Sequence, residues 1–170
     1  LKYMKICIGT ANFNREYGLH QKKLTYLQKN KVLNQLIKNN INFLDTANGY
    51  KNDSFLMQNK KFNIITKLST LRYFSISKLE KEIQLQIQNL IKHKPLYAVL
   101  IHDCKDMFSK KNLEIYKCLL NLKKRKMVKK IGISCYHEAD LKILKKFNFD
   151  IVQFPLNVFD QRILKKENIK

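Results

Sequence analysis

The sequence contains no tryptophan, only two prolines and only four glycines among its 170 residues. The scarcity of proline and glycine excludes collagen-like, linker-rich and low-complexity chains, which need these residues in abundance. Acidic residues are also few, at 13 against 34 basic ones, so the formal net charge is +21. Hydrophobic residues make up 45% of the chain, and this fraction supports one globular domain, which we expect to span residues 1–170.

The excess of positive charge raises the question of an anionic partner. An isoelectric point near 9.9 is typical of proteins that bind nucleic acid or an anionic membrane. Here the basic residues are almost all lysines and are spread along the chain instead of forming one stripe. We therefore expect neither nucleic acid nor membrane as a partner, and interpret the charge as a solvated surface whose field attracts an anionic cofactor.

Cysteine spacing and the length of the hydrophobic runs exclude further classes. None of the four cysteines forms a C-x-x-C pair, and no histidine has ligand-like spacing to them, so we expect reduced thiols and no metal site. No apolar run approaches the length of a membrane span, and the first residues lack the long apolar region of a signal peptide. These features predict a cytoplasmic protein and leave its oligomeric state open.

Short apolar runs alternate with longer amphipathic stretches along the whole chain, which indicates a parallel sheet covered by helices. The expected strands are 5–9, 41–45, 62–67, 97–102, 128–133 and 150–154. The expected helices lie around 32–37, 77–91, 109–126 and 141–144, with helix-like sequence from 158 onward. This periodicity does not distinguish a doubly wound sheet from a barrel.

Two of these helices carry more specific signals. Ser77 and Glu80 have the spacing of a capping box, which predicts a helix start at this point. The helix around 109–126 has four residues at the spacing of an inward-facing stripe. These residues are Leu113, Tyr116, Leu119 and Leu120.

Polar side chains stand at the carboxyl ends of the expected strands, where parallel α/β folds collect their functional groups. Asp45 ends the second strand and Tyr50 follows it. Lys67 ends the third strand and His102 ends the fourth. A nearby ammonium lowers the pKa of a tyrosine, and a carboxylate holds that ammonium in place. With a histidine that orients a carbonyl oxygen, the four groups would protonate the alkoxide formed when hydride arrives.

Taken singly, each of the four residues has a simpler structural explanation. Tyr50 alone would be a packed aromatic at the rim, and Lys67 alone a surface lysine with a buried stem. His102 alone would be a hydrogen-bonded histidine at a strand end, and Asp45 alone the cap of a turn or helix. All four residues come from three successive strand ends on one rim, and this combination favours the chemical interpretation.

Several segments resemble motifs of the aldo/keto reductase family, in the family's order. Residues 41–50, INFLDTANGY, resemble its G-x-N-F-x-D-T-A-x-x-Y signature without the opening glycine. Four further matches and an N-terminal one, similar to a bacterial branch of the family, follow the same order. They are IITK at 64–67, LIH at 100–102, KIGIS at 130–134, DIVQF at 150–154 with Asn157, and IGTANF at 8–13 with Tyr17 and Gly18.

The resemblance implies a (β/α)8 barrel that binds NADPH or NADH without a Rossmann motif and reduces an aldehyde or ketone. It implies Tyr50 as the general acid, Lys67 and Asp45 as residues that tune it, and His102 as the residue that orients the substrate. The cofactor-binding residues implied by the family are Gly9, Thr10, Asp45, Ser134 and Gln153, of which Ser134 and Gln153 would contact the nicotinamide carboxamide.

Two positions depart from the family pattern. Asn40 stands where the signature opens with glycine, a mild change because asparagine tolerates turn geometry. Cys135 stands where the family usually has asparagine, which removes one expected contact to the carboxamide.

Length limits the expected barrel. A (β/α)8 barrel typically needs about 250 residues, and this chain provides roughly six of the eight strand–helix units. We therefore expect an incomplete barrel, from a truncated gene product, a gene fragment or a partial sequence. The leading hypothesis is a carbonyl-reducing oxidoreductase, and the alternative is a catalytically inactive remnant or binding module of the same family.

Overall fold

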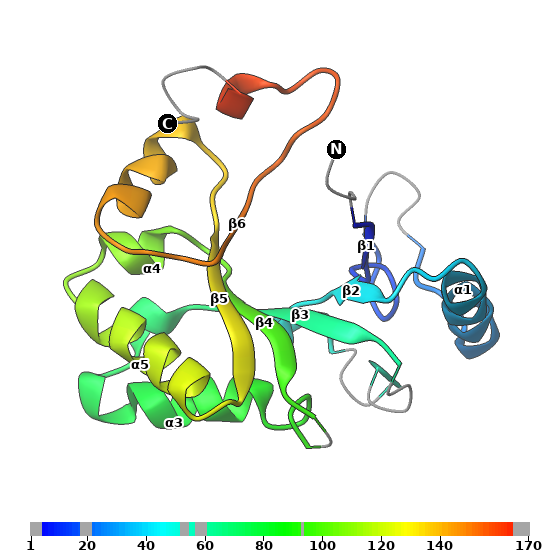
Figure 1. Cartoon of the computed structure of the whole chain (residues 1–170), viewed down its shortest axis with the longest axis horizontal. Helices are drawn as coiled ribbons and strands as arrows, with labels where there is room; N and C mark the ends of the chain where they lie inside the picture. Colours follow the sequence, from blue (N-terminus) through cyan, green and yellow to red (C-terminus); the bar gives the residue numbers. More distant parts are fainter. Residues whose placement is uncertain (1–4, 18–21, 52–54, 57–60, 93, 165–170) are drawn as a thin grey trace.

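A computed structural model describes residues 5–17, 22–51, 55–56, 61–92 and 94–164. Six parallel strands form one sheet in the order in which they occur along the chain, and the sheet curls into part of a barrel with helices on its outer side (Figure 1). The strands are β1 (Cys7–Gly9), β2 (Phe43–Asp45), β3 (Asn63–Leu68), β4 (Leu96–Ile101), β5 (Val128–Ser134) and β6 (Ile151–Gln153). All six predicted strands are confirmed, with ends that differ by one or two residues, and the fold is an incomplete (β/α)8 barrel of about six units.

The helices between the strands cover the outer face of the sheet. The α-helices with defined bounds are α1 (Tyr26–Lys38), α3 (Ile76–Ile87), α4 (Lys105–Phe108) and α5 (Asn112–Lys124). Four short 3-10 helices complete the described elements: η1 (Asn48–Tyr50), η2 (Leu71–Tyr73), η3 (Glu138–Lys145) and η4 (Arg162–Leu164). The expected helix around 141–144 is thus the 3-10 helix η3. Residues 158–161 are not helical, and the rest of the predicted tail helix after 164 lies outside the described residues.

The predicted start of α3 is wrong, because the helix begins before Ser77. Ser75 occupies the N-cap, and its hydroxyl contacts that of Ser77 at 3.2 Å. The ammonium of Lys111 donates to the carbonyl oxygens of Arg72 and Phe74 at 2.8 and 2.5 Å. These two bonds hold the chain just before the helix. The start of α3 at Ile76 therefore coincides with contacts from a residue that is distant in sequence.

The predicted inward stripe of α5 is only partly right. Leu119 is buried as expected, but Leu113 and Leu120 are 47% and 42% exposed. Ile115 and Leu122 occupy the buried face with Leu119 instead. The helix presents apolar residues on more than one face, and packing against β5 selects the face that carries Ile115.

Strand register determines which side chains share the inner face of the curled sheet. Neighbouring residues in register point to the same face, and side chains alternate along each strand. Asp45 pairs with Gly9 on one side and Ile65 on the other, while Lys67 pairs with Leu100. The side-chain amide of Gln153 on β6 reaches the Asp45 carboxylate on β2 at 3.4 Å. A bond between strands so far apart in the sheet shows that the inner face is concave.

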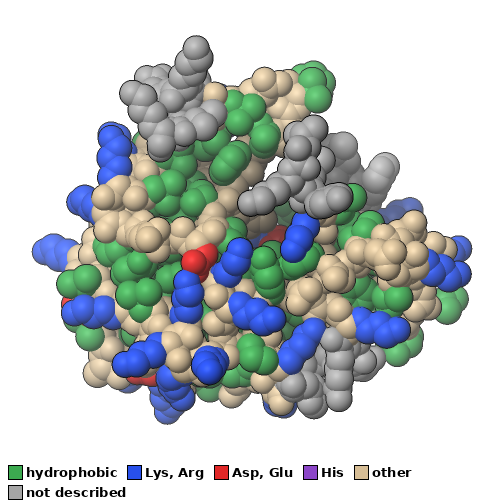
Figure 2. All heavy atoms as spheres, viewed as in Figure 1, with side chains coloured by type: hydrophobic (Ala, Val, Ile, Leu, Met, Phe, Trp, Pro, Cys, Tyr) green, Lys and Arg blue, Asp and Glu red, His purple; other side chains and the backbone are tan. Residues whose placement is uncertain are grey.

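Charge is distributed over the surface. Lys and Arg side chains are scattered among hydrophobic and neutral ones over the face drawn in Figure 2. No helix among the described residues is long and apolar enough to cross a membrane.

Gly132 on β5 is in register with Ile151 on β6. A β-carbon at this position would lie 2.4 Å from the carbonyl oxygen of Ile151, which is backbone and moves only with its strand. The absence of a side chain at Gly132 is therefore a requirement for pairing these two strands.

Replacing Gly132 with alanine is expected to lower the free energy of unfolding by about 1–3 kcal/mol, the usual cost of overpacking. Urea denaturation followed by circular dichroism measures the change. Gly9→Ala is the matched control, since a β-carbon there meets no atom within 4 Å. Equal denaturation midpoints for the two variants would contradict the interpretation of Gly132.

Candidate active site

The carboxyl ends of the strands surround a pocket of about 230 Å³. Its lining comes from the ends of β2 to β6, from the loops that follow them, and from the segment after β1 that carries Tyr17. The lining residues are Tyr17, Asp45, Tyr50, Lys67, His102, Ser134, Cys135, Tyr136, Gln153, Phe154 and Pro155. Six residues predicted from the sequence are among them, so the structure brings the four candidate catalytic residues together with two further candidate cofactor residues, Ser134 and Gln153.

Lys67, near the end of β3, carries a buried ammonium, and its side chain is only 5% exposed. The ammonium lies 2.5 and 2.6 Å from the two carboxylate oxygens of Asp45 and donates to the Thr46 carbonyl at 3.3 Å. A charge buried to this degree needs a charged, hydrogen-bonded partner. Asp45 and the Thr46 carbonyl therefore fix the position of the Lys67 ammonium beside the pocket.

The Asp45 carboxylate also anchors a chain of side chains across the inner face. The amide nitrogen of Gln153 donates to Asp45 Oδ2 at 3.4 Å, and the Ser134 hydroxyl donates to the amide oxygen of Gln153 at 3.2 Å. The backbone N–H of Cys135 donates to the Gln153 carbonyl at 2.8 Å. Ser134 and Gln153 thus form an ordered pair of a hydroxyl and an amide on one wall of the pocket.

His102 follows β4 and lines the same pocket. Its Nδ1 lies 3.3 Å from the Ser69 hydroxyl. Burial lowers the pKa of His102 and the charge of Lys67 lowers it further, while Asp45 and Asp103 oppose this shift. The imidazole is therefore neutral near pH 7, and a neutral imidazole has one ring nitrogen that donates and one that accepts.

Tyr50 lies on η1, and its pKa is raised chiefly by burial and then by the charge of Asp45. The sequence-based expectation that a nearby ammonium lowers this pKa is wrong in direction, because burial outweighs the nearby positive charge. The cation that opposes the rise is the Arg15 guanidinium, 5.1 Å from the Tyr50 ring centroid. A raised pKa keeps the proton on the phenol near pH 7, although it also makes the phenol a weaker acid, because a general acid works best with a pKa near the working pH.

Sequence reasoning missed the aromatic and basic groups that surround Tyr50. Arg15 also lies 5.3 Å from the ring centroid of Tyr17, so its guanidinium contacts two tyrosine rings. Tyr136 completes this wall of the pocket, and burial raises its pKa. Arg15 and Tyr136 lie in loops and belong to no motif used in the sequence analysis. Tyr17 had a signal, since with Gly18 it resembles a family segment.

Gly9 and Thr10 lie beside the pocket but not among its lining residues. Gly9 pairs in register with Asp45, and the space next to it is open, with no atom within 4 Å of a β-carbon placed there. Thr10 is buried, and both its backbone N–H and its hydroxyl donate to the Asp45 carbonyl, at 2.9 and 3.0 Å. Thr10 therefore supports the backbone that carries Asp45.

Cys135 lines the pocket from a buried position and has a second cysteine beside it. A hydrogen bond to Cys135 raises the pKa of the Cys104 thiol, and burial adds to the effect. Thiols with a raised pKa are poor nucleophiles, and the Cys104 side chain is also buried, so neither feature favours a reactive thiol at this position. No group of three or more His, Cys, Asp or Glu residues that could hold a metal ion occurs in the described part of the chain.

Replacing Asp45 with asparagine is expected to lower the free energy of unfolding by about 3–5 kcal/mol, because it leaves the Lys67 ammonium buried without a counter-charge. Urea denaturation measures the loss. Glu80→Gln breaks the exposed pair with Arg125, whose side chains are 49% and 50% exposed, and should cost less than about 1 kcal/mol. A similar, small loss in both variants would show that the Lys67–Asp45 pair is not a buried interaction.

His102 predicts a specific pH dependence of stability. Its folded-state pKa lies below its ordinary value of 6.5, so below pH 6.5 the unfolded chain binds a proton more readily than the folded one, and the folded state loses stability. The His102→Asn variant should therefore lose less stability than the wild type when the pH falls from 6.5 to 5. Between pH 7 and 8 the stability of both proteins should change by the same small amount. Denaturation midpoints across this range test it, and parallel curves for the two proteins would refute it.

Comparison with known proteins points to one family. No curated protein matches the chain in sequence. A putative aldo-keto reductase from Pseudomonas aeruginosa has a TM-score of 0.72 at 19% identity, and the match covers 92% of this chain and 64% of that one. An aldo-keto reductase from Bacillus halodurans in its holo form has a TM-score of 0.70 at 15% identity, with 94% and 56% covered. At such identities these likenesses show the fold, and the chain spans less than two thirds of either structure.

The family itself is established by a sequence model. The model of the aldo/keto reductase family matches residues 5–170, which is nearly the whole chain and includes every residue of the pocket. The six-stranded part of a barrel and the order of the motifs agree with this match, and so this chain belongs to the aldo/keto reductase family.

Proposed function

We propose that this chain is an oxidoreductase that reduces the carbonyl group of a small aldehyde or ketone, with Tyr50 as the general acid. The observation that carries the proposal is the pocket itself. It combines a protonated phenol, a buried lysine–carboxylate pair and a neutral imidazole within about 230 Å³. Membership of the aldo/keto reductase family supports the reaction class.

The cofactor in this proposal is NADPH, with NADH as the other candidate. The Ser134 hydroxyl and the Gln153 amide offer donors and acceptors that suit a carboxamide, and Gly9 leaves open space beside Asp45. When bound, the nicotinamide would supply the hydride. Cys135 offers only a weak donor where the family usually has asparagine, so Ser134 and Gln153 carry the recognition of the carboxamide in this proposal.

The residues of the chain then handle the oxygen and its proton. His102, held neutral by burial, donates a hydrogen bond that orients the carbonyl oxygen of the substrate. As the carbonyl carbon receives hydride, the developing alkoxide takes the phenolic proton of Tyr50. The phenolate that remains is stabilised by the Arg15 guanidinium over its ring and regains a proton from solvent. The Asp45 carboxylate holds the Lys67 ammonium in place beside the pocket throughout.

The alternative proposal is an inactive remnant or binding module of the same family. This alternative is supported by the limited coverage of the solved structures, since the chain spans 64% of one and 56% of the other of the two described above. It predicts no stabilisation of the fold by NADPH. Melting curves with and without NADPH separate the two proposals, since a ligand that binds the native state raises the melting midpoint.

The setting proposed for this reaction is the cytoplasm, with a small carbonyl compound as the substrate and neither nucleic acid nor a membrane as a partner. All four cysteines are free, as in proteins of a reducing compartment. The scattered basic side chains support attraction of an anionic cofactor rather than recognition of nucleic acid.

Replacing Tyr50 with phenylalanine is expected to reduce turnover of an aldehyde by at least about 100-fold, since general acid catalysis contributes that much or more. Binding of NADPH, followed by its fluorescence, should change little because the phenol is not part of the proposed carboxamide contact. Tyr73→Phe, at a side chain 72% exposed and outside the pocket, is the control and should keep full turnover. Wild-type turnover in Tyr50→Phe would remove Tyr50 from the mechanism.

A further inference from the structure

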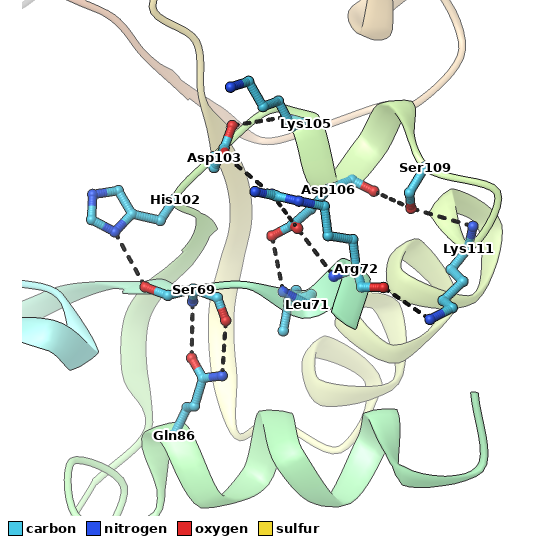
Figure 3. A network of polar contacts seen from close by, with 10 residues as sticks. All are labelled: Ser69, Leu71, Arg72, Gln86, His102, Asp103, Lys105, Asp106, Ser109 and Lys111. Atoms are coloured by element: carbon cyan, nitrogen blue, oxygen red, sulfur yellow. Dashed lines mark hydrogen bonds and ion pairs between the residues drawn. The ribbon is translucent and has the colours of Figure 1, made fainter. Parts of the chain in front are cut away.

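The Ser69 hydroxyl contacts the imidazole ring of His102, and Ser69 is not among the residues that line the pocket. Ser69 follows β3, and its Oγ lies 3.3 Å from Nδ1 of His102. Figure 3 shows the second ring nitrogen pointing away from Ser69. The backbone N–H of His102 donates to the Leu68 carbonyl at 2.8 Å, which fixes the main chain of the histidine against the end of β3. The Ser69 contact then determines how the ring is turned.

Ser69 is itself held by a side chain from α3. The amide oxygen of Gln86 accepts the backbone N–H of Ser69 at 2.9 Å, and its amide nitrogen donates to the Ser69 carbonyl at 3.1 Å (Figure 3). Gln86 thus satisfies both backbone groups of one residue, as a neighbouring strand would. The Gln86 side chain therefore holds the backbone of Ser69 in place, although β3 ends one residue earlier.

The residues after Ser69 are held just as firmly by a buried carboxylate. Asp106 on α4 is fully buried and accepts the backbone N–H groups of Leu71 and Arg72, each at 3.1 Å. It also accepts the Arg72 guanidinium at 2.9 Å (Figure 3). Between the two anchors, Thr70 adopts a left-handed φ of 60°, a costly conformation that persists where the surroundings impose it. The turn that carries Ser69 is therefore rigid on both sides.

A hydroxyl beside Nδ1 decides which tautomer a neutral histidine adopts. If the hydroxyl donates to Nδ1, the ring proton sits on Nε2 and that nitrogen can donate toward the pocket. If Nδ1 carries the proton instead, Nε2 is an acceptor and cannot hydrogen-bond a carbonyl oxygen. Among the described residues, the side-chain partner found for the Ser69 hydroxyl is Nδ1 of His102. The hydroxyl proton of Ser69 is therefore available for a hydrogen bond to this nitrogen.

We propose that Ser69 is a positioning residue: its hydroxyl donates to Nδ1 of His102 and holds the imidazole as the Nε2–H tautomer, with Gln86 fixing Ser69 in place. The inference rests on the proposed function for its purpose, because only the Nε2–H tautomer can orient a substrate carbonyl. The charged groups that act on His102 are Lys67 and Arg15, which disfavour its protonation, and Asp45 and Asp103, which favour it. None of these four supplies the contact to Nδ1.

The test is the ¹⁵N chemical shifts of the two imidazole nitrogens of His102 in the full-length protein near pH 8, where the ring is neutral. We expect Nδ1 at the position of an acceptor nitrogen and Nε2 at that of a donor nitrogen. Ser69→Ala should move Nδ1 toward the donor position, while Ser69→Thr, which keeps a hydroxyl, should not. Ser77→Ala, at an exposed serine of α3, is the matched control and should leave both shifts unchanged.

Gln86→Ala gives a second, independent measurement. It should move the His102 shifts in the same direction as Ser69→Ala but less far, whereas Gln84→Ala, which removes a contact to Glu80 on the same helix, should move nothing. In the active protein, Ser69→Ala should lower kcat between about 10- and 100-fold, as misplacement of an orienting group does, with cofactor affinity retained.

Different results would overturn the role of Ser69 and the proposed function. A donor-type Nδ1 in the wild type, or identical shifts in Ser69→Ala, overturns the role of Ser69 whether or not the protein turns over substrate. Absence of turnover in the wild type overturns the proposed function, and the tautomer is still read from the spectra.

Discussion

The buried ammonium of Lys67 is the constraint around which the inner face is arranged. A lysine this deeply enclosed is tolerated only with a carboxylate in contact, and Asp45 supplies one from the neighbouring strand. Asp45 in turn receives Thr10 on its backbone carbonyl and Gln153 on its carboxylate. Strands β1, β3 and β6 therefore all contact one residue of β2. Such a pair is weak evidence for net stability, because desolvation offsets much of its attraction, but it places the charged groups firmly.

The strands and the main site residues could be predicted from the sequence because both follow from short-range patterns. Apolar runs marked six strands, and parallel strands carry their functional groups at one edge, so Asp45, Lys67 and His102 were expected to meet. Ser134 and Gln153 were found through family motifs alone. The expectation that Thr10 lines the cofactor cleft stays a prediction, and in the structure its hydroxyl donates to the Asp45 carbonyl. Side-chain alternation accounts for that contact, since Thr10 follows Gly9 by one position and Gly9 is in register with Asp45.

What the sequence did not reveal depends on contacts between distant segments and on burial. At the start of α3, Lys111 forms hydrogen bonds with the preceding turn. The buried face of α5 is the face that packs on β5. The direction of the Tyr50 pKa depends on how far the pocket excludes water, which no motif records. Ser69 and Gln86 gave no signal either, because a serine after a strand and a glutamine in a helix are ordinary. Only their approach in space, with Thr70 in a left-handed conformation between the anchors, marks them.

The consecutive order of the strands has a consequence for how the protein is made. Each strand pairs with the one before it in the chain, so the sheet can grow by addition as segments leave the ribosome, and no strand waits for a distant partner. The Gln153–Asp45 bond is the exception, since 108 positions separate its residues. The Asp45 carboxylate therefore gains the Gln153 contact only after β6 has been synthesised and has reached the inner face of β2. Before that point the carboxylate has the Lys67 ammonium as its partner, and the sixth strand adds the last of the contacts that fix its direction.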